Sequence, residues 1–246
     1  VAAPEPTGGL ESQYGLGPAA SKVYGIARGL SIGGYAEGYY RRSESGVDDE
    51  ADMTRVVAYL GYKFNDWIVF NTEIEFEHGS TSENGSVSVE FATLDFLLMP
   101  ELNVRAGEVL IPMGFVNEFH EPPFYYSTFR PTAERVIIPS TWRENGLGIF
   151  GNLGERLSYR LYAVNGMVAS DFRSSGLRSG RQNGSEAIAN DLALVGRLDL
   201  DVFEGMRIGS SFYSGNSGQD QDIEIGGSDV SLPDARTTIW EVHGEY

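Results

Sequence analysis

The sequence of 246 residues predicts an all-β protein, a transmembrane antiparallel up-and-down β-barrel with about ten strands in this chain. Three observations lead to this prediction. Segments of about ten residues alternate between apolar and polar side chains, short and long connections alternate between them, and aromatic residues gather at the ends of the segments. Short turns at one rim, long loops at the other and aromatic girdles are features of outer-membrane barrels.

The segment WIVFNTEIEFE, which begins at Trp67, shows the alternation most clearly. Its even-numbered positions are apolar or neutral, whereas its odd-numbered positions include three glutamates. The segment DLALVGRLDLDV, which begins at Asp191, places leucines opposite Arg197, Asp199 and Asp201. Successive side chains of a strand point to opposite faces, so both segments have one apolar and one charged face. Both are about as long as a tilted strand that crosses a membrane.

We expect ten strands, near residues 30–41, 55–64, 67–77, 87–98, 103–111, 145–153, 157–165, 191–202, 206–214 and 238–246. The long polar connections are expected at residues 42–52, 78–86, 112–144, 168–190 and 215–235. We expect residues 1–20 to form a flexible lead-in and residues 21–246 the barrel. A soluble β-sandwich also has alternating strands. The difference in loop length between the two rims and the aromatic strand ends favour the barrel.

Composition limits the classes of function. The chain carries 18 Lys and Arg against 35 Asp and Glu, a formal net charge of −17, so we expect no nucleic-acid partner. It has no cysteine, which excludes disulfides and thiolate metal sites. Only Lys22 and Lys63 are lysines. The first residues have no basic start or apolar core of a signal peptide, so an exported protein would be in its mature form.

The segment 112–144 differs from the rest of the chain because it has neither helical nor strand periodicity and is rich in aromatics, prolines and charges of both signs. Long loops within a compact domain are uncommon and are usually functional or disordered. Its aromatic residues argue against disorder. We therefore expect an ordered loop with a function.

Four segments resemble bacterial outer-membrane porins related to the phosphate-selective porin group. They are GLSIGGYAEGYY, NVRAGEVLIPMGFVNEFHEPPFYYSTFRP, VIIPSTWRENGLGIFG and TTIWEVHGEY. The resemblance runs from about Leu16 to Tyr246, and residues 109–151 carry most of its specificity. It implies a sixteen-stranded barrel, a homotrimer, and a long loop that folds into the lumen and narrows the pore. The loop 112–144 would be that constriction.

This chain differs from the phosphate-selective members in two ways. With only two lysines and a negative excess, it is not expected to be specific for phosphate. It also contains only ten expected strands. Eight strands close around an interior filled by side chains, whereas sixteen to eighteen leave an aqueous channel. A ten-stranded barrel has little room for a folded loop of about thirty residues, so we expect a larger barrel, with a complete ten-stranded barrel as the alternative.

The resemblance and the alternation together give two sets of candidate residues. The candidate constriction consists of Glu118, His120, Glu121, Arg130, Glu134, Arg135, Arg143 and Glu144. The candidate pore lining consists of Arg55, Lys63, Glu73, Glu75, Glu77, Arg160, Arg197, Asp199, Asp201, Arg207, Glu241 and Glu245. Opposed charges across a narrow passage would favour small polar solutes. Alternatively, these charges pair with one another and hold the loop against the wall.

No catalytic, cofactor or metal site is expected. The three histidines lack metal-ligand spacing, and glutamates on one face of a strand are more simply a polar lining than a catalytic pair. We expect a passive porin in a Gram-negative outer membrane, surrounded by lipid and lipopolysaccharide, that passes small hydrophilic solutes or ions with weak cation preference. The alternatives are a structural or adhesive barrel with a plugged lumen and a soluble carbohydrate-binding sandwich.

Overall fold

The computed structural model describes residues 11–43, 46, 48–81, 84–125, 130–136, 138, 139, 141–232 and 234–246, with only the backbone for Pro123, Arg135, Val136 and Ile225. The chain divides into two compact units, residues 1–92 and residues 93–246.

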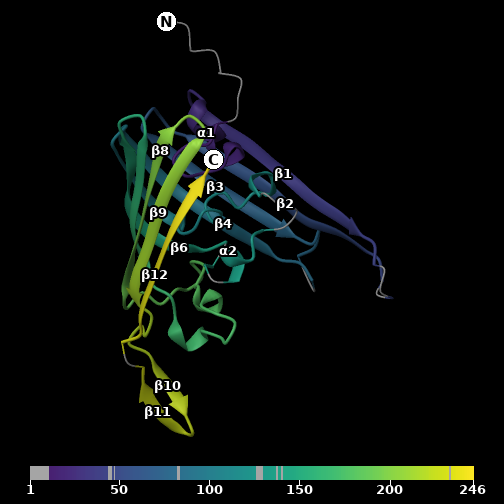
Figure 1. Ribbon diagram of the computed structural model, residues 1–246, viewed down its shortest axis with the longest axis vertical. Helices are drawn as coiled ribbons and strands as arrows, with labels where there is room; N and C mark the ends of the chain where they lie inside the picture. The colour runs from purple at the N-terminus through teal and green to yellow at the C-terminus, as the bar shows by residue number, and fades with distance from the viewer. Residues whose placement is uncertain are drawn as a thin grey trace, which may run out of the picture. The chain divides into compact units, whose positions relative to one another are not determined.

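Ten strands form one antiparallel up-and-down sheet in which each strand is hydrogen-bonded to the next. They are β1 (Gly29–Arg41), β2 (Glu50–Lys63), β3 (Ile68–Glu77), β4 (Val87–Met99), β5 (Leu102–Leu110), β6 (Arg143–Leu153), β7 (Leu157–Asn165), β8 (Leu192–Phe203), β9 (Met206–Asn216) and β12 (Arg236–Glu245). In the second unit, β8, β9 and β12 lie side by side (Figure 1). The all-β, antiparallel, up-and-down prediction is therefore confirmed for the described residues.

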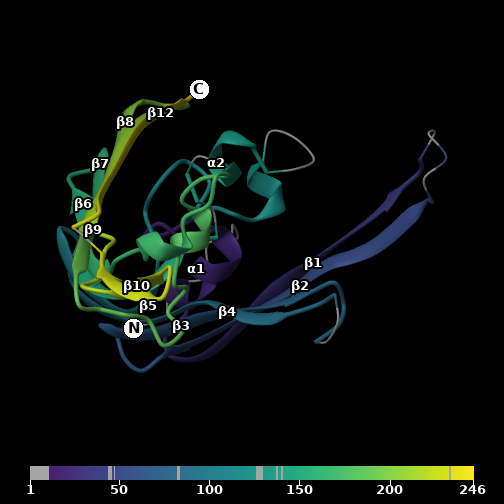
Figure 2. The same ribbon diagram turned by 90° about the horizontal axis from the view of Figure 1, so that it is seen from below.

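The remaining elements are short. They are the helices α1 (Pro18–Gly25) and α2 (Ala133–Val136), the 3-10 turns η1 (Pro122–Phe124), η2 (Ala169–Asp171) and η3 (Arg178–Gly180), and the hairpin strands β10 (Asp222–Ile225) and β11 (Ser228–Ser231). In the second unit, the connection that carries α2 lies on one side of the row of strands from β6 to β12 (Figure 2). No helix among the described residues is long and apolar enough to cross a membrane.

Each expected strand has a counterpart, although several boundaries differ. β2 begins at Glu50 because its pairing with β1 continues to Arg41 opposite Glu50. β6 begins at Arg143 because its ladder with β5 extends to Leu110 opposite Arg143. The connection 215–235 contains the β10–β11 hairpin, which turns at two glycines, Gly226 and Gly227, with positive φ.

The expected lead-in includes a helix. Residues 1–10 lie outside the described residues, but Pro18 begins α1 at the first helical position, where its missing N–H costs nothing. Leu16, Ala20 and Val23 are buried. The helix contacts β1, β2 and β3, so this part of the chain belongs to the packing of the first unit.

The two faces of the strands differ in chemistry and exposure. One face, called the apolar face, carries large side chains that are exposed, including Leu30, Phe70 and Phe76 in the first unit and Leu147, Leu192, Leu198 and Trp240 in the second. The opposite face, called the polar face, carries Asn71, Glu73 and Glu75 in the first unit and Arg105, Arg160, Arg197 and Asp199 in the second. These polar side chains are buried.

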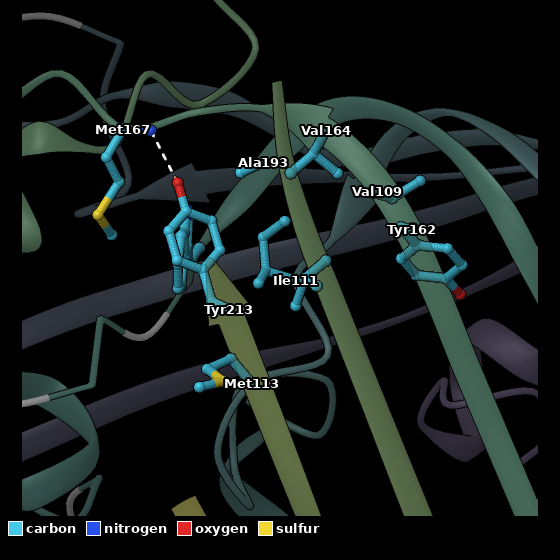
Figure 3. Packing of buried hydrophobic residues seen from close by; sticks show 10 residues of the cluster. Val109, Ile111, Met113, Tyr162, Val164, Met167, Ala193 and Tyr213 are labelled. Carbon is cyan, nitrogen blue, oxygen red and sulfur yellow. Dashed lines mark hydrogen bonds between the residues drawn. The ribbon is translucent and has the colours of Figure 1, made fainter. Parts of the chain in front are cut away.

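An apolar cluster lies on the polar-face side of the second unit, where the strands meet the loops. Tyr213 from β9 packs beside Trp142 with their ring centroids 4.9 Å apart. The backbone N–H of Met167 donates a hydrogen bond of 2.9 Å to the Tyr213 hydroxyl (Figure 3). Val109, Ile111 and the other members of the cluster are fully buried, so this hydrogen bond is isolated from solvent.

Replacing Tyr213 by Phe should lower the free energy of unfolding by about 1–3 kcal/mol, because the buried N–H of Met167 loses its partner. Denaturant titration followed by tryptophan fluorescence measures the loss. Tyr159→Phe is the matched control, since its hydroxyl donates to the carbonyl of Glu101 at an exposed position. Equal losses in the two variants would show that burial of the Met167 N–H contributes nothing.

Candidate functional site

The described residues of the connection between β5 and β6 (111–125, 130–136, 138, 139, 141 and 142) lie on the polar face of the second unit. The backbone N–H of Gly114 donates to the Ser211 hydroxyl of β9 over 3.2 Å. Arg197 of β8 donates to the carbonyl oxygen of Gly114 over 2.5 Å. The ring of Phe115 lies 5.5 Å from that of His243 in β12. The described part of this connection, called the inner loop, is therefore attached to three neighbouring strands.

Asn117 joins the two ends of the inner loop. Its side-chain amide donates to the carbonyl oxygens of Ile111 and Trp142 over 2.7 and 2.8 Å. Its side-chain oxygen accepts from the backbone N–H of Trp142 over 2.8 Å. The backbone N–H of Ile111 also donates to the carbonyl oxygen of Trp142 over 2.9 Å, so the Asn117 side chain reinforces the last backbone contact between the two ends and closes the loop at its base.

Glu118 connects the inner loop to the wall by charge. Its carboxylate lies 2.9 Å from the Arg160 guanidinium of β7 and 3.6 Å from that of Arg197 in β8. All three side chains are buried. Burial raises the pKa of the Glu118 carboxyl, while the two guanidinium groups act in the opposite direction.

Asp199 is the common acceptor of the wall. It accepts hydrogen bonds from Arg160 (2.9 Å) and from two nitrogens of Arg197 (2.8 and 2.9 Å). Its carboxylate also lies 2.9 Å from Nε2 of His243, whose Nδ1 lies 3.1 Å from both carboxylate oxygens of Glu241. The wall network, defined as Glu118, Arg160, Arg197, Asp199, Glu241 and His243, has two guanidiniums and three carboxylates around one imidazole.

Two further loop charges hold the loop itself. Glu134 of α2 accepts hydrogen bonds from the backbone N–H groups of Phe115 and Val116. Burial raises the pKa of the Glu134 carboxyl, and these N–H donors oppose that shift. Arg130 donates to the hydroxyls of Tyr125 (3.0 Å) and Thr141 (2.5 Å). These contacts lie within the loop.

The other candidate constriction residues are placed as follows. His120 and Glu121 are buried in the loop, and Nδ1 of His120 lies 2.8 Å from the carbonyl oxygen of Asn117. The side chain of Arg135 lies outside the described residues. Arg143 and Glu144 were assigned to the loop, but both belong to β6 because the β5 ladder reaches them.

In β6, Arg143 pairs with Glu108 of β5 at 3.1 Å. Glu144 is fully buried and accepts from the Trp142 indole, the Asn165 amide and the backbone N–H of Gln182. Glu144 therefore joins β6 to β7 and to the connection that follows β7.

The candidate lining residues of the first unit lie on its polar face. Arg55 lies 3.0 Å from Glu37 and 3.1 Å from Glu75. Lys63 donates to the carbonyl oxygen of Tyr24 in α1 over 2.9 Å. Glu73 is buried, whereas Glu77 at the end of β3 is exposed. The acidic lining is therefore partly neutralised and partly covered.

In the second unit, the lining residues beyond the wall network lie near the short turns. Arg207 and Asp201 pair at 2.7 Å, and both side chains are about half exposed. Glu245 is exposed. The structure thus separates the predicted lining into a buried network and an exposed group.

A buried pair of the second unit was missed. Arg105 donates to both carboxylate oxygens of Asp95 over 2.8 Å, and its guanidinium lies 4.7 Å from the centre of the Phe150 ring. The alternation of the two strands could have predicted this pair, since both residues occupy polar-face positions of neighbouring strands.

The wall network and the contacts within the inner loop hold segments of the chain in position. Among the described residues, no group of three or more His, Asp or Glu side chains has an arrangement that could hold a metal ion. Within the wall network, opposite charges are in contact, which is how buried charges are tolerated. The arrangement therefore supports the reading in which loop charges hold the loop against the wall.

Comparisons with known proteins give the following findings. No family model matches the chain. The sequence is 45% identical over 214 residues to an uncharacterized protein of Aquifex aeolicus (strain VF5), a match that covers 84% of this chain and 49% of that protein. The chain therefore spans about half the length of this relative. A solved structure, OmpTdeltaL8, is a loop L8 deletion mutant of OmpT, an outer membrane protein of Vibrio cholerae. It matches with 12% identity and a TM-score of 0.48, over 90% of this chain and 65% of that chain.

Replacing Asp199 by Asn should lower the free energy of unfolding by about 3–5 kcal/mol, because it removes the negative charge, and one of the two acceptor oxygens, that two buried guanidiniums share. Denaturant titration measures the change. Asp201→Asn is the matched control, two positions along the same face of β8. It breaks a half-exposed pair that is worth about 0–1 kcal/mol. Similar losses in both variants would contradict the role of the network.

Proposed function

We propose that this chain is the channel-forming part of an outer-membrane β-barrel that lets small hydrophilic solutes or ions diffuse passively. The observation that carries the proposal is the exposure of the apolar face. Trp240 is 75% exposed, Leu192 63% and Leu30 62%. Monomeric soluble proteins rarely expose large contiguous apolar surfaces, and such surfaces mark contacts with partners or membranes.

The opposite face supports the same proposal. A soluble sandwich buries its apolar face against a second sheet and leaves its polar face in water. Here the apolar face is exposed and the charged face is covered by chain. Transmembrane barrels have this distribution, because lipid contacts the outer side chains and water or plugging segments contact the inner ones. The sandwich alternative is therefore not supported.

The remaining parts of the proposal concern closure and assembly. In the strand order of the described residues, β1 and β12 are the end strands of the sheet. An open edge within lipid would leave backbone groups without partners, so a membrane barrel has to close. Because the inner loop already covers the polar face of the second unit, we propose closure with further strands, as in a sixteen-stranded barrel, and a homotrimer as the resemblance implies.

The plugged, structural barrel is the second candidate, and one observation favours it. The loop charges Glu118, Arg130 and Glu134 are all engaged in holding the inner loop, so this loop could equally close the lumen. Conductance separates the two candidates. A passive channel conducts, whereas a plugged barrel with the same orientation in the membrane does not.

The first test concerns orientation in lipid vesicles. Because the chain has no cysteine, single cysteines report one position each. A lipid-soluble thiol label should react with Leu60→Cys and Phe70→Cys variants and spare Tyr59→Cys and Glu73→Cys. A water-soluble label should reach Glu101→Cys, in an exposed turn, and not Phe70→Cys. Rapid reaction of the Phe70 variant with the water-soluble label would place the apolar face in water and defeat the proposal.

The second test concerns the passage. Deleting residues 121–132 should raise single-channel conductance in planar bilayers, because it removes loop mass and keeps the anchors Asn117 and Glu118. In a salt gradient across the same bilayer, the reversal potential should indicate a weak preference for cations. Acidic side chains of the lining attract cations that come within a Debye length of about 8 Å at physiological salt. Unchanged conductance would place the deleted segment outside the pore, and a clear anion preference would contradict the reading of the lining.

A further inference from the structure

Helix α1 occupies the polar face of the first unit. The side-chain amide of Asn71 in β3 donates to the carbonyl oxygen of Ala20 over 2.8 Å, at a buried position. Ala20, Ser21, Val23 and Tyr24 are all buried. The apolar side chains of β3, such as Phe70, lie on the opposite face and are exposed. The helix therefore packs on the side of the sheet that faces away from lipid in the proposed barrel.

Two glycines shape the strands to receive the helix. A Cβ atom at Gly61 of β2 would lie 2.6 Å from Cβ and Cγ2 of Val23, which is closer than real Cβ contacts. A Cβ atom at Gly33 of β1 would lie 3.2 Å from the carbonyl oxygen of Ala19. Glycine in a strand marks the close approach of other backbone. These two positions explain how α1 lies directly against the sheet.

Both lysines of the chain serve this contact. Lys22 of α1 donates to the carbonyl oxygen of Ile32 in β1 over 2.9 Å. Lys63 of β2 donates to the carbonyl oxygen of Tyr24 over 2.9 Å. Tyr24 lies in the last turn of the helix, where carbonyl groups have no partner within the helix and cations are favourable. A chain with 18 basic residues thus places its two lysines across the same contact.

We infer that α1 is a fixed luminal segment that narrows the channel beside β1, β2 and β3. The inference rests on the proposed channel function. An α-helix with its side chains is about 10–12 Å across, so a helix on the luminal wall takes up a large part of a pore. The hydrogen bonds from Asn71 and Lys63 and the contact at Gly61 hold it in one position, so it acts as part of the wall and limits conductance.

Deletion of residues 18–25 in the otherwise complete protein should raise single-channel conductance. The matched control is deletion of residues 222–231, the β10–β11 hairpin, which forms its own two-stranded sheet and whose β11 residues are exposed. This control should leave conductance unchanged. A rise specific to the helix deletion supports the inference. Equal conductance in the unaltered protein and the helix deletion would overturn it.

A second measurement does not require the deletion variant to fold. Val23 is 1% exposed, so a Val23→Cys variant should react slowly with a water-soluble maleimide. Adding Lys63→Met should increase the rate by about tenfold, the factor expected from loss of one charge-assisted hydrogen bond that holds the helix. Glu101→Cys, alone and with Lys63→Met, is the control and should react at one rate. Rapid labelling of Val23→Cys in the unaltered background would show that α1 is not held on the wall.

The outcomes separate the inference from the function on which it rests. A protein that does not conduct at all overturns the proposed channel. A protein that conducts, but whose conductance is insensitive to the helix deletion, overturns only the role of α1. The labelling experiment applies even where the deletion variant fails to fold. If Val23→Cys reacts slowly and Lys63→Met accelerates the reaction, α1 is held in a fixed position. If the rates with and without Lys63→Met are equal, the inference is overturned.

Discussion

The buried guanidinium of Arg197 joins the wall of the second unit to the loop that covers it. Two of its nitrogens donate to Asp199 on its own strand, and a third donates to the carbonyl oxygen of Gly114 in the inner loop. A charge withdrawn from water costs several kcal/mol unless it is paired and hydrogen-bonded. The strand supplies only part of this compensation. The buried wall and the folded inner loop therefore depend on each other, and Glu118 extends the same dependence to Arg160 on the next strand.

The first unit meets the same requirement with fewer charges. Part of its polar face is covered by α1, whose backbone carbonyls accept from Asn71 and Lys63. In both units, a strand face with polar side chains is covered by a segment of the chain itself, and the opposite apolar face is left exposed. Covering the polar face and exposing the apolar one reverses the usual arrangement of a water-soluble sheet.

The strands could be predicted because their signal is local. Residues 67–77 and 191–202 each alternate with a period of two, whatever strands lie beside them. The positions of Arg197 and Asp199 on the polar face follow from this alternation. Helix α1 could not be predicted in this way, because eight residues are too few to form a stable helix alone and its contacts come from Gly61 and Lys63, about forty residues later. The sequence also could not predict which charges pair with one another. The pairing of Arg105 with Asp95, and the place of Arg143 in β6, depend on the register between strands.

The strand order has a consequence for how the chain folds. Every strand of the ten-stranded sheet pairs with the next strand of that sheet along the chain, so each pair can form without a strand from elsewhere in the sequence. The slowest closures should be those across the longest connections, including residues 111–142 and 217–235. Doubling a loop adds only about 0.6 kcal/mol of closure entropy. Within 217–235, the β10–β11 hairpin brings its own ends together, which shortens the effective distance between β9 and β12. The β10–β11 hairpin is not part of the ten-stranded sheet, but it can therefore speed the pairing of β12, the last strand of that sheet.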